Sequence, residues 1–252
     1  MSVFEVQGVV QFKIRRKDAH SKICKFGEKM QLSIFEVLGP VMIGPSSSHT
    51  AGAARLGRVA AVIASKPFHL VRFGLSGSFA KTGVGHGTRK ALLAGVLGLA
   101  QDDERIREIE HLAAERRVKA EYYDRELDNM HENSASIAFF HDDGSQSEIW
   151  GSSTGGGRII ITRINGLEME ITAESPTLVI PHADKPSVVS DISRVLAGKN
   201  INIAELRLSR QSKGKRSTVV IETDKQITAA VLEQLREVKH VIEVILVDVP
   251  QL

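Results

Sequence analysis

The chain has 252 residues, of which 42% are hydrophobic and 25% charged, the balance of an ordinary globular protein with one large domain or two modest ones. A net charge of +3 with only 5% aromatic residues does not indicate nucleic-acid binding, because basic and aromatic side chains are not interleaved. One cysteine, Cys24, excludes a disulfide framework or a thiolate metal cage, and no apolar run reaches the roughly 18 residues that cross a bilayer, so we expect a cytoplasmic protein.

Residues 1–30 form a basic segment that we expect to be an extension outside the fold. The segment lacks the apolar core and small-residue cleavage site of a secretory signal. The pattern at Met1 to Val6 nearly recurs at Leu32 to Val37, directly after Met30. We therefore hypothesise that Met30 begins the functional unit.

A loop of small and hydroxyl residues then leads into a helix predicted over Ala51–Ile63. Ser48 or Thr50 is expected to cap this helix. A helix N-terminus attracts anions, so the hydroxyls around His49 predict a site for a carboxylate. The alternative is an ordinary N-cap with an incidental histidine. The residues of this predicted site are Ser46, Ser47, Ser48, His49 and Thr50.

A second loop, Ser76–Thr88, repeats this arrangement after a strand predicted over Leu70–Leu75. Gly85 and Gly87 flank His86 and precede a helix predicted over Arg89–Leu99. Glycines let the backbone approach a ligand and leave the imidazole open for proton transfer near neutral pH. A dinucleotide-binding fingerprint is disfavoured because a histidine stands between the glycines. A purely structural histidine is the alternative.

The middle of the chain changes from helical to strand periodicity. A charged, solvent-facing helix is predicted over Asp102–Arg117. Strands and hairpin turns follow, and Ala173–Pro176 is predicted to be a linker. Met130–Ser134 is interpreted as a loop, and Gly155–Gly157 as either a close approach to a ligand or partner or a simple turn. The predicted strands are Ser136–Phe140, Ser147–Trp150, Arg158–Arg163 and Leu167–Ile171.

The last third predicts a strand, helix, strand, strand, helix, strand unit, which is the ferredoxin-like arrangement. A hairpin is expected at Lys213–Lys215. The predicted elements are Thr177–Ile180, Ser187–Ala197, Ile203–Arg210, Ser217–Glu222, Thr228–Leu235 and Val241–Val249.

Polar residues near the first helix of this unit predict a pocket for a small amino acid at a subunit interface. They are expected to gather around one helix N-terminus, with turn and cap chemistry as the alternative. The residues are His182, Asp184, Lys185, Ser187, Asn200 and Asn202.

The segment from Gly44 to Arg55, with Gly85 to Thr88 and the alanine-rich helix after it, resembles the beta subunits of bacterial iron-sulfur-dependent L-serine dehydratases, also called L-serine ammonia-lyases. The last third resembles an ACT domain, in which glycine is usual at the place of Ser187. The resemblance implies an α+β fold, with a serine dehydratase beta domain over 31–172 and an ACT domain over 176–252.

The resemblance also implies a two-subunit enzyme. The alpha subunit would carry a 4Fe-4S cluster, with no metal ligand on this chain, and an open iron would act as Lewis acid on the serine hydroxyl while a base removes the α-proton. Catalytic roles are expected for His49 and His86, and substrate binding for Ser46, Ser47, Ser48, Thr50, Gly85 and Gly87. A stand-alone amino-acid-binding regulatory protein is the alternative, and a phosphate-binding enzyme is disfavoured because no P-loop lysine pattern is present.

Overall fold

The structure is a computed structural model that describes residues 40–249. The hypotheses about residues 1–30 and Met30 lie outside the described residues. No helix within 40–249 is long and apolar enough to cross a membrane. The elements are η1 Ser47–Gly52, α2 Ala53–Ala64, β1 Phe68–Ser76, α3 Gly77–Thr82, α4 Thr88–Val96, η2 Glu104–Glu108, α5 Ile109–Glu115, β2 Lys119–Asp124, β3 Asn133–His141, β4 Gln146–Gly155, β5 Arg158–Ile164, β6 Leu167–Ile171, β7 Thr177–Ala183, α6 Val188–Gly198, β8 Ile203–Arg210, β9 Arg216–Thr223, α7 Ala229–Arg236 and β10 Ile245–Val247.

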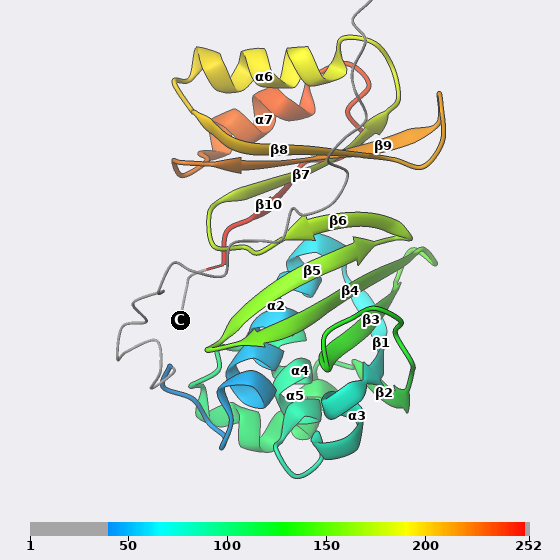
Figure 1. Ribbon diagram of the computed structural model, residues 1–252, viewed down its shortest axis with the longest axis vertical. Coiled ribbons are helices and arrows are strands. Elements are labelled where there is room, and N and C mark those ends of the chain that lie inside the picture. The colour runs from blue at the N-terminus through cyan, green and yellow to red at the C-terminus, as the bar shows by residue number, and fades with distance from the viewer. Residues whose placement is uncertain (1–39, 250–252) are drawn as a thin grey trace, which may run out of the picture. The chain divides into compact units, whose positions relative to one another are not determined.

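The first sheet has six strands in the order β2-β1-β3-β4-β5-β6. Strands β1 and β2 are parallel, and the helices between them in sequence form the crossover that a parallel pair needs. The other neighbouring pairs are antiparallel, and strands β3 to β6 also follow one another in the chain. Helices α2 and α4 lie together on one face of this sheet (Figure 1).

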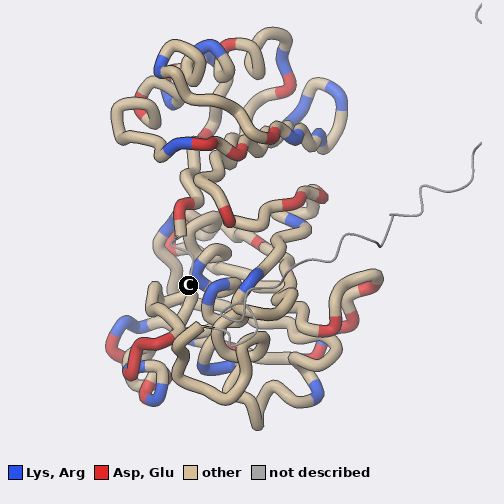
Figure 2. The backbone as a smooth tube through the Cα atoms, turned by 60° about the vertical axis from the view of Figure 1, so that its left-hand side comes forward, with Lys and Arg blue, Asp and Glu red and all other residues tan. Residues whose placement is uncertain are grey.

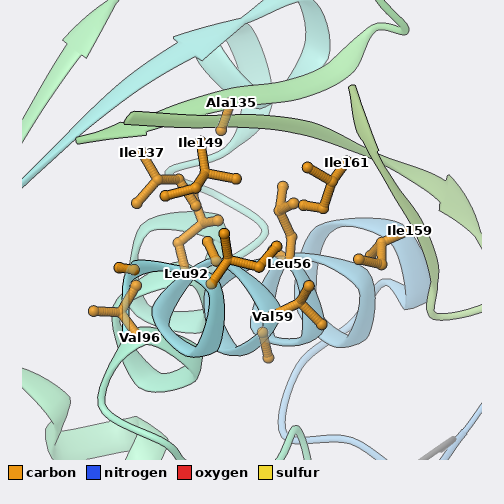
Figure 3. Packing of buried hydrophobic residues seen from close by; sticks show 14 of the residues in the cluster. Leu56, Val59, Leu92, Val96, Ala135, Ile137, Ile149, Ile159 and Ile161 are labelled. Carbon is orange, nitrogen blue, oxygen red and sulfur yellow. The ribbon is translucent and has the colours of Figure 1, made fainter. Parts of the chain in front are cut away.

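Side chains from the two helices and the sheet fill one apolar core. Leu56 and Val59 of α2 lie beside Leu92 and Val96 of α4, and Ile137, Ile149 and Ile161 of the central strands face them (Figure 3). Leu56, Val59, Leu92 and the three isoleucines are fully buried. Such burial stabilises the fold by about 1.5–3 kcal/mol for each large side chain.

Two glycines let α2 and α4 approach closely. A Cβ on Gly57 would overlap the Leu92 carbonyl oxygen, and a Cβ on Gly95 would overlap the Ala54 carbonyl oxygen. Because η1 precedes α2 and the Gly83–Gly87 loop precedes α4, this contact also fixes the distance between the two predicted site loops. The helix contact thus positions the candidate site.

The second sheet has four antiparallel strands in the order β10-β7-β9-β8, with α6 and α7 on one face (Figure 1). Leu178 and Ile180 of β7 pack under Ile192 and Leu196 of α6. The order strand, helix, strand, strand, helix, strand confirms the predicted ferredoxin-like unit and, with the first sheet, the α+β fold.

Some predicted elements were wrong. The segment Gly77–Thr82, expected as loop, is helix α3, and strand β2 was missed. The helix expected over Asp102–Arg117 is divided into η2 and α5 and is not wholly solvent-facing, because Ile106 and Ile109 are buried against the core. The strand expected over Val241–Val249 is only Ile245–Val247, since the residues before it make a single bridge and turn-like hydrogen bonds to β7.

The charged residues do not form a continuous basic stripe on the described chain. Lysine and arginine are interspersed with aspartate and glutamate around both sheets (Figure 2). Many are paired, for example Arg125 with Glu148 and Arg72 with Glu121. Exposed pairs of this kind contribute at most about 1 kcal/mol each.

Candidate active site

The first site loop forms η1, a short π-helical segment of the kind often found at functional positions. Its N-cap is Ser46, whose Oγ accepts a hydrogen bond from the His49 backbone N–H at 3.2 Å. The expected caps, Ser48 and Thr50, were wrong because both lie inside the helical turn that Ser46 begins. This turn directs the His49 side chain inward, where it is only 8% exposed.

The His49 imidazole lies among hydroxyl groups and one aromatic ring. Its Nε2 lies 3.2 Å from the Ser78 Oγ and 3.1 Å from the Thr82 Oγ1, both on helix α3. Its Nδ1 lies 3.5 Å from the Ser46 Oγ, and the edge of Phe79 packs against the ring. Both ring nitrogens therefore have polar neighbours in an otherwise apolar setting.

His86 comes from the second loop and lies beside His49. The ring centroids are 4.8 Å apart, and the His86 Nδ1 is 3.0 Å from the Thr82 carbonyl oxygen. The Thr50 hydroxyl, which is buried, donates to the His86 carbonyl oxygen at 3.4 Å. Thr50 therefore joins the two loops through its side chain. The structure brings together the two histidines that the sequence predicted as catalytic.

Burial lowers the pKa of the His49 imidazole below its ordinary value of 6.5. Contact with the Ser78 backbone opposes this shift, and the nearby His86 lowers the pKa further. The low pKa favours the neutral imidazole at physiological pH, and a neutral imidazole has one nitrogen that can accept a proton.

The remaining predicted substrate-binding residues lie at the open side of this pair. Ser46, Ser47 and Ser48 are partly exposed, and Gly85 is exposed in the second loop. Gly87 has a φ of 72° and forms the N-cap of α4. These positions leave hydroxyl groups and backbone in reach of a small polar ligand.

The sheet end beside η1 also contributes hydroxyl groups. Ser134 of β3 and Ser152 of β4 are buried and lie 2.7 Å apart between their Oγ atoms, and η1 packs against β4. The buried Ser153 Oγ has no hydrogen-bond partner within residues 40–249. A Cβ added to Gly155 would lie 3.8 Å from the Ser48 Oγ, so the glycine turn after β4 adjoins the first loop. Ser134 belongs to the segment interpreted as a loop, and Gly155 to the segment interpreted as either a close approach to a ligand or partner or a simple turn. Both segments border the site.

Sequence reasoning did not assign a role to Ser78 and Thr82, which touch His49. The two residues are four apart, so both side chains lie on one face of α3. Recognising a helical turn in Gly77–Thr82 would have predicted this pair of hydroxyls. The segment was interpreted instead as a glycine-rich loop.

The predicted effector residues of the second sheet do not gather in one place. His182 is buried, its Nδ1 donates to the Ala183 carbonyl at 2.8 Å, and its Nε2 has no partner among the described residues. Asp184 accepts from the Gly214 backbone N–H at 2.7 Å and faces Arg210 at 3.5 Å. Lys185 and Ser187 are exposed at the start of α6.

Asn200 and Asn202 correct the expectation of one shared helix N-terminus. Both follow the C-terminal end of α6, whose 11 residues separate them from Ser187 by about 16 Å. The Asn202 Nδ2 donates to Asp224 at 2.5 Å, and the Asn200 carbonyl accepts from Lys225 at 3.0 Å. Within one copy of the chain, these asparagines stabilise a different turn.

No three His, Cys, Asp or Glu side chains of residues 40–249 lie close enough together to hold a metal ion. His49 and His86 are adjacent, but their other polar neighbours are hydroxyl groups and carbonyl oxygens. The described donor set therefore does not fit an iron-sulfur cluster, which needs thiolate ligands.

The fold and site define a class of protein, in which a mixed-sheet domain with paired serine and histidine loops is followed by an ACT-type ferredoxin-like unit. Comparison with known proteins agrees. Residues 33–127 match the family described as serine dehydratase beta chain, and residues 178–243 match the AHAS small subunit-like ACT domain.

Relatives extend this match over most of the chain. The probable L-serine dehydratase beta chain of Bacillus subtilis (strain 168) is 36% identical over 212 residues, which cover 84% of this chain and 96% of that protein. The L-serine dehydratase beta chain of Peptoniphilus asaccharolyticus is 40% identical over 197 residues, which cover 78% of this chain and 89% of that protein. A Mycobacterium bovis protein named L-serine dehydratase is 42% identical over 74 residues, which cover 27% of this chain and 16% of that protein. The chain belongs to the serine dehydratase beta chain family.

Proposed function

We propose that this chain is the beta subunit of an L-serine ammonia-lyase and, with an alpha subunit, converts L-serine to pyruvate and ammonia. The observation that carries the proposal is the pair of histidines from two separate loops, with ring centroids 4.8 Å apart among hydroxyl groups. Membership of the serine dehydratase beta chain family supports the substrate and the reaction. We also propose that the enzyme acts in the cytoplasm.

The substrate carboxylate binds at the first loop in this proposal. Ser46, Ser47 and Ser48 are partly exposed and carry hydroxyl donors within one turn of His49. A carboxylate that accepts several hydrogen bonds is held in one orientation, which places the α-carbon near the histidine pair. Thr50 contributes indirectly, because its buried hydroxyl holds the second loop against the first.

Proton transfer is the role of the two histidines. Loss of water from serine requires removal of the α-proton and delivery of a proton to the departing hydroxyl, so a base and an acid must lie close together. His49 is held largely neutral by burial, and the partly exposed His86 lies beside it. The enamine formed by loss of water tautomerises to an imine, and water hydrolyses the imine to pyruvate and ammonia.

The cofactor of the proposed enzyme is a 4Fe-4S cluster carried by the alpha subunit, which would supply a Lewis acid for the substrate hydroxyl. The donor groups described on this chain are imidazoles and hydroxyls, which suit substrate binding and proton transfer. The ACT unit is proposed to bind an amino-acid effector around His182, Asp184, Lys185 and Ser187. Asn200 and Asn202 would have to come from the opposite end of α6 or from another copy.

The test is anaerobic co-expression with a cysteine-containing alpha subunit, purification through a tag on this chain, and assay of pyruvate from L-serine. We expect the complex to form pyruvate and this chain alone to form none. His86→Ala should lower kcat about 10²- to 10⁴-fold. His69→Ala is the matched control, since His69 is exposed, pairs with Asp142 and lies outside the site.

Near wild-type turnover in His86→Ala would overturn the proton-transfer role. If no alpha subunit co-purifies and calorimetry shows an amino acid binding to the isolated chain, the protein is a regulatory sensor and the lyase proposal is wrong.

A further inference from the structure

Thr82 presents a hydrogen-bonding group to each of the two candidate catalytic histidine rings. Its side-chain Oγ1 lies 3.1 Å from the His49 Nε2, and its backbone carbonyl oxygen lies 3.0 Å from the His86 Nδ1. Thr82 is the last residue of α3, and its side chain is on the same face as Ser78. One residue therefore has a hydrogen-bonding group in front of each ring.

The carbonyl contact determines the tautomer of neutral His86. A carbonyl oxygen only accepts hydrogen bonds, so the His86 Nδ1 must carry the hydrogen at 3.0 Å from the Thr82 oxygen. The lone pair of the neutral ring is then on Nε2. His86 is thereby left with a proton acceptor on the side of the ring away from the backbone.

The hydroxyl contacts favour the opposite tautomer for His49. Thr82 Oγ1 has three neighbours: the Ser78 carbonyl oxygen at 3.0 Å, the His49 Nε2 at 3.1 Å and the Ser78 Oγ at 3.2 Å. The carbonyl cannot donate and is the nearest of the three, so it takes the single hydroxyl hydrogen of Thr82. The Thr82 oxygen then accepts from the other two neighbours, which places the hydrogen of His49 on Nε2.

We propose that Thr82, supported by Ser78, is a positioning residue that holds the two histidines in complementary tautomers, with the lone pair on Nδ1 of His49 and on Nε2 of His86. This inference deepens the proposed lyase function, since the two proton-transfer groups would otherwise populate several tautomers. Burial of His49 agrees with it, because a neutral ring has a defined tautomer and a charged ring has none.

The direct test is imidazole ¹⁵N NMR of the full chain at about pH 8, where neutral imidazole predominates. The two histidines are assigned by the loss of their signals in His49→Gln and His86→Gln. We expect a pyrrole-type Nε2 for His49 and a pyrrole-type Nδ1 for His86. A pyrrole-type Nδ1 on His49 in the wild type would overturn the proposal.

The variants separate positioning from general disruption. Thr82→Val keeps the branched shape but removes the hydroxyl, so His49 should become a mixture of tautomers while His86 keeps its Nδ1 hydrogen, because the backbone carbonyl remains. Thr82→Ser should restore the His49 signal. Unchanged His49 signals in both Thr82→Val and Ser78→Ala would contradict the proposal. Thr228→Val is the control, since this exposed threonine forms no side-chain cap hydrogen bond.

Enzyme assays of the alpha-beta complex give an independent readout. We expect Thr82→Val to lower kcat about 10- to 100-fold with little change in KM, and Thr82→Ser to restore most of the loss. An equal kcat in Thr82→Val and the wild type would reject the positioning role. If the wild-type complex itself forms no pyruvate, the lyase proposal fails while the NMR result still decides the tautomers.

Discussion

The two polar clusters that the sequence predicted differ in how the chain brings them together. In the first domain, η1 and the Gly83–Gly87 loop are 30 or more residues apart, yet His49 and His86 lie side by side. In the ACT unit, residues from a single stretch of chain were expected to share a pocket. There Ser187 and Asn202 lie at opposite ends of α6.

The difference teaches that polar residues meet when a packed element holds them, and not because they are close in sequence. The first cluster depends on the contact between α2 and α4, whose N-terminal ends carry the two loops. The residues of the second cluster would have to meet across the whole length of α6, which separates Ser187 from Asn202.

Gly95→Ala should have the largest effect on stability. The added methyl overlaps the Ala54 carbonyl oxygen, so α2 and α4 must separate and the two loops with them. Overpacking of this kind costs about 1–3 kcal/mol. Chemical denaturation should show a lower free energy of unfolding, and the alpha-beta complex should lose activity as the histidines move apart.

Gly198→Ala is the matched control in the ACT unit. No atom lies within 4 Å of a Cβ at this helical position. The substitution should leave the free energy of unfolding unchanged or raise it by up to about 0.5 kcal/mol, because alanine favours helix over glycine. Equal losses in both variants would contradict the special role of the α2–α4 contact.

Ser187→Gly should stabilise the chain modestly. Ser187 has a φ of 73°, in the left-handed region that disfavours a side chain, at the place where ACT domains usually have glycine. Relief of this strain should raise the free energy of unfolding by up to about 1 kcal/mol, reduced by the greater freedom of glycine in the unfolded chain. A fall in stability would show that the Ser187 side chain, which hydrogen-bonds Asp191, contributes more than the strain costs.

Acid should produce the smallest of these effects, through His49. The pKa of this imidazole is lowered in the folded chain, chiefly by burial, so the unfolded chain takes up the proton first as the pH falls. The stability contributed by neutral His49 is fully present above pH 6.5, the ordinary pKa. It is lost as the pH falls through 6.5 towards the lower pKa of the folded chain. Wild type should therefore lose more stability than His49→Gln between about pH 7 and 5. Parallel pH curves would rule out this linkage.

Much of the fold was predictable, because each long element has its own pattern. The helix of Leu56 and Val59 and the strands of Ile137, Ile149 and Ile161 bury regularly spaced apolar residues, which the periodicity predicts. Short elements lack such a repeat. Helix α3 has six residues and was missed, and with it Ser78 and Thr82.

The sequence by itself determined that two serine- and histidine-containing loops precede helices and that a ferredoxin-like unit ends the chain, because loops, caps and periodicity are local properties. Only the tertiary structure decided that Thr82 faces both histidines and that the asparagines after α6 lie away from Ser187. Distances between segments far apart in the chain depend on how helices pack, and here that packing depends on Gly57 and Gly95.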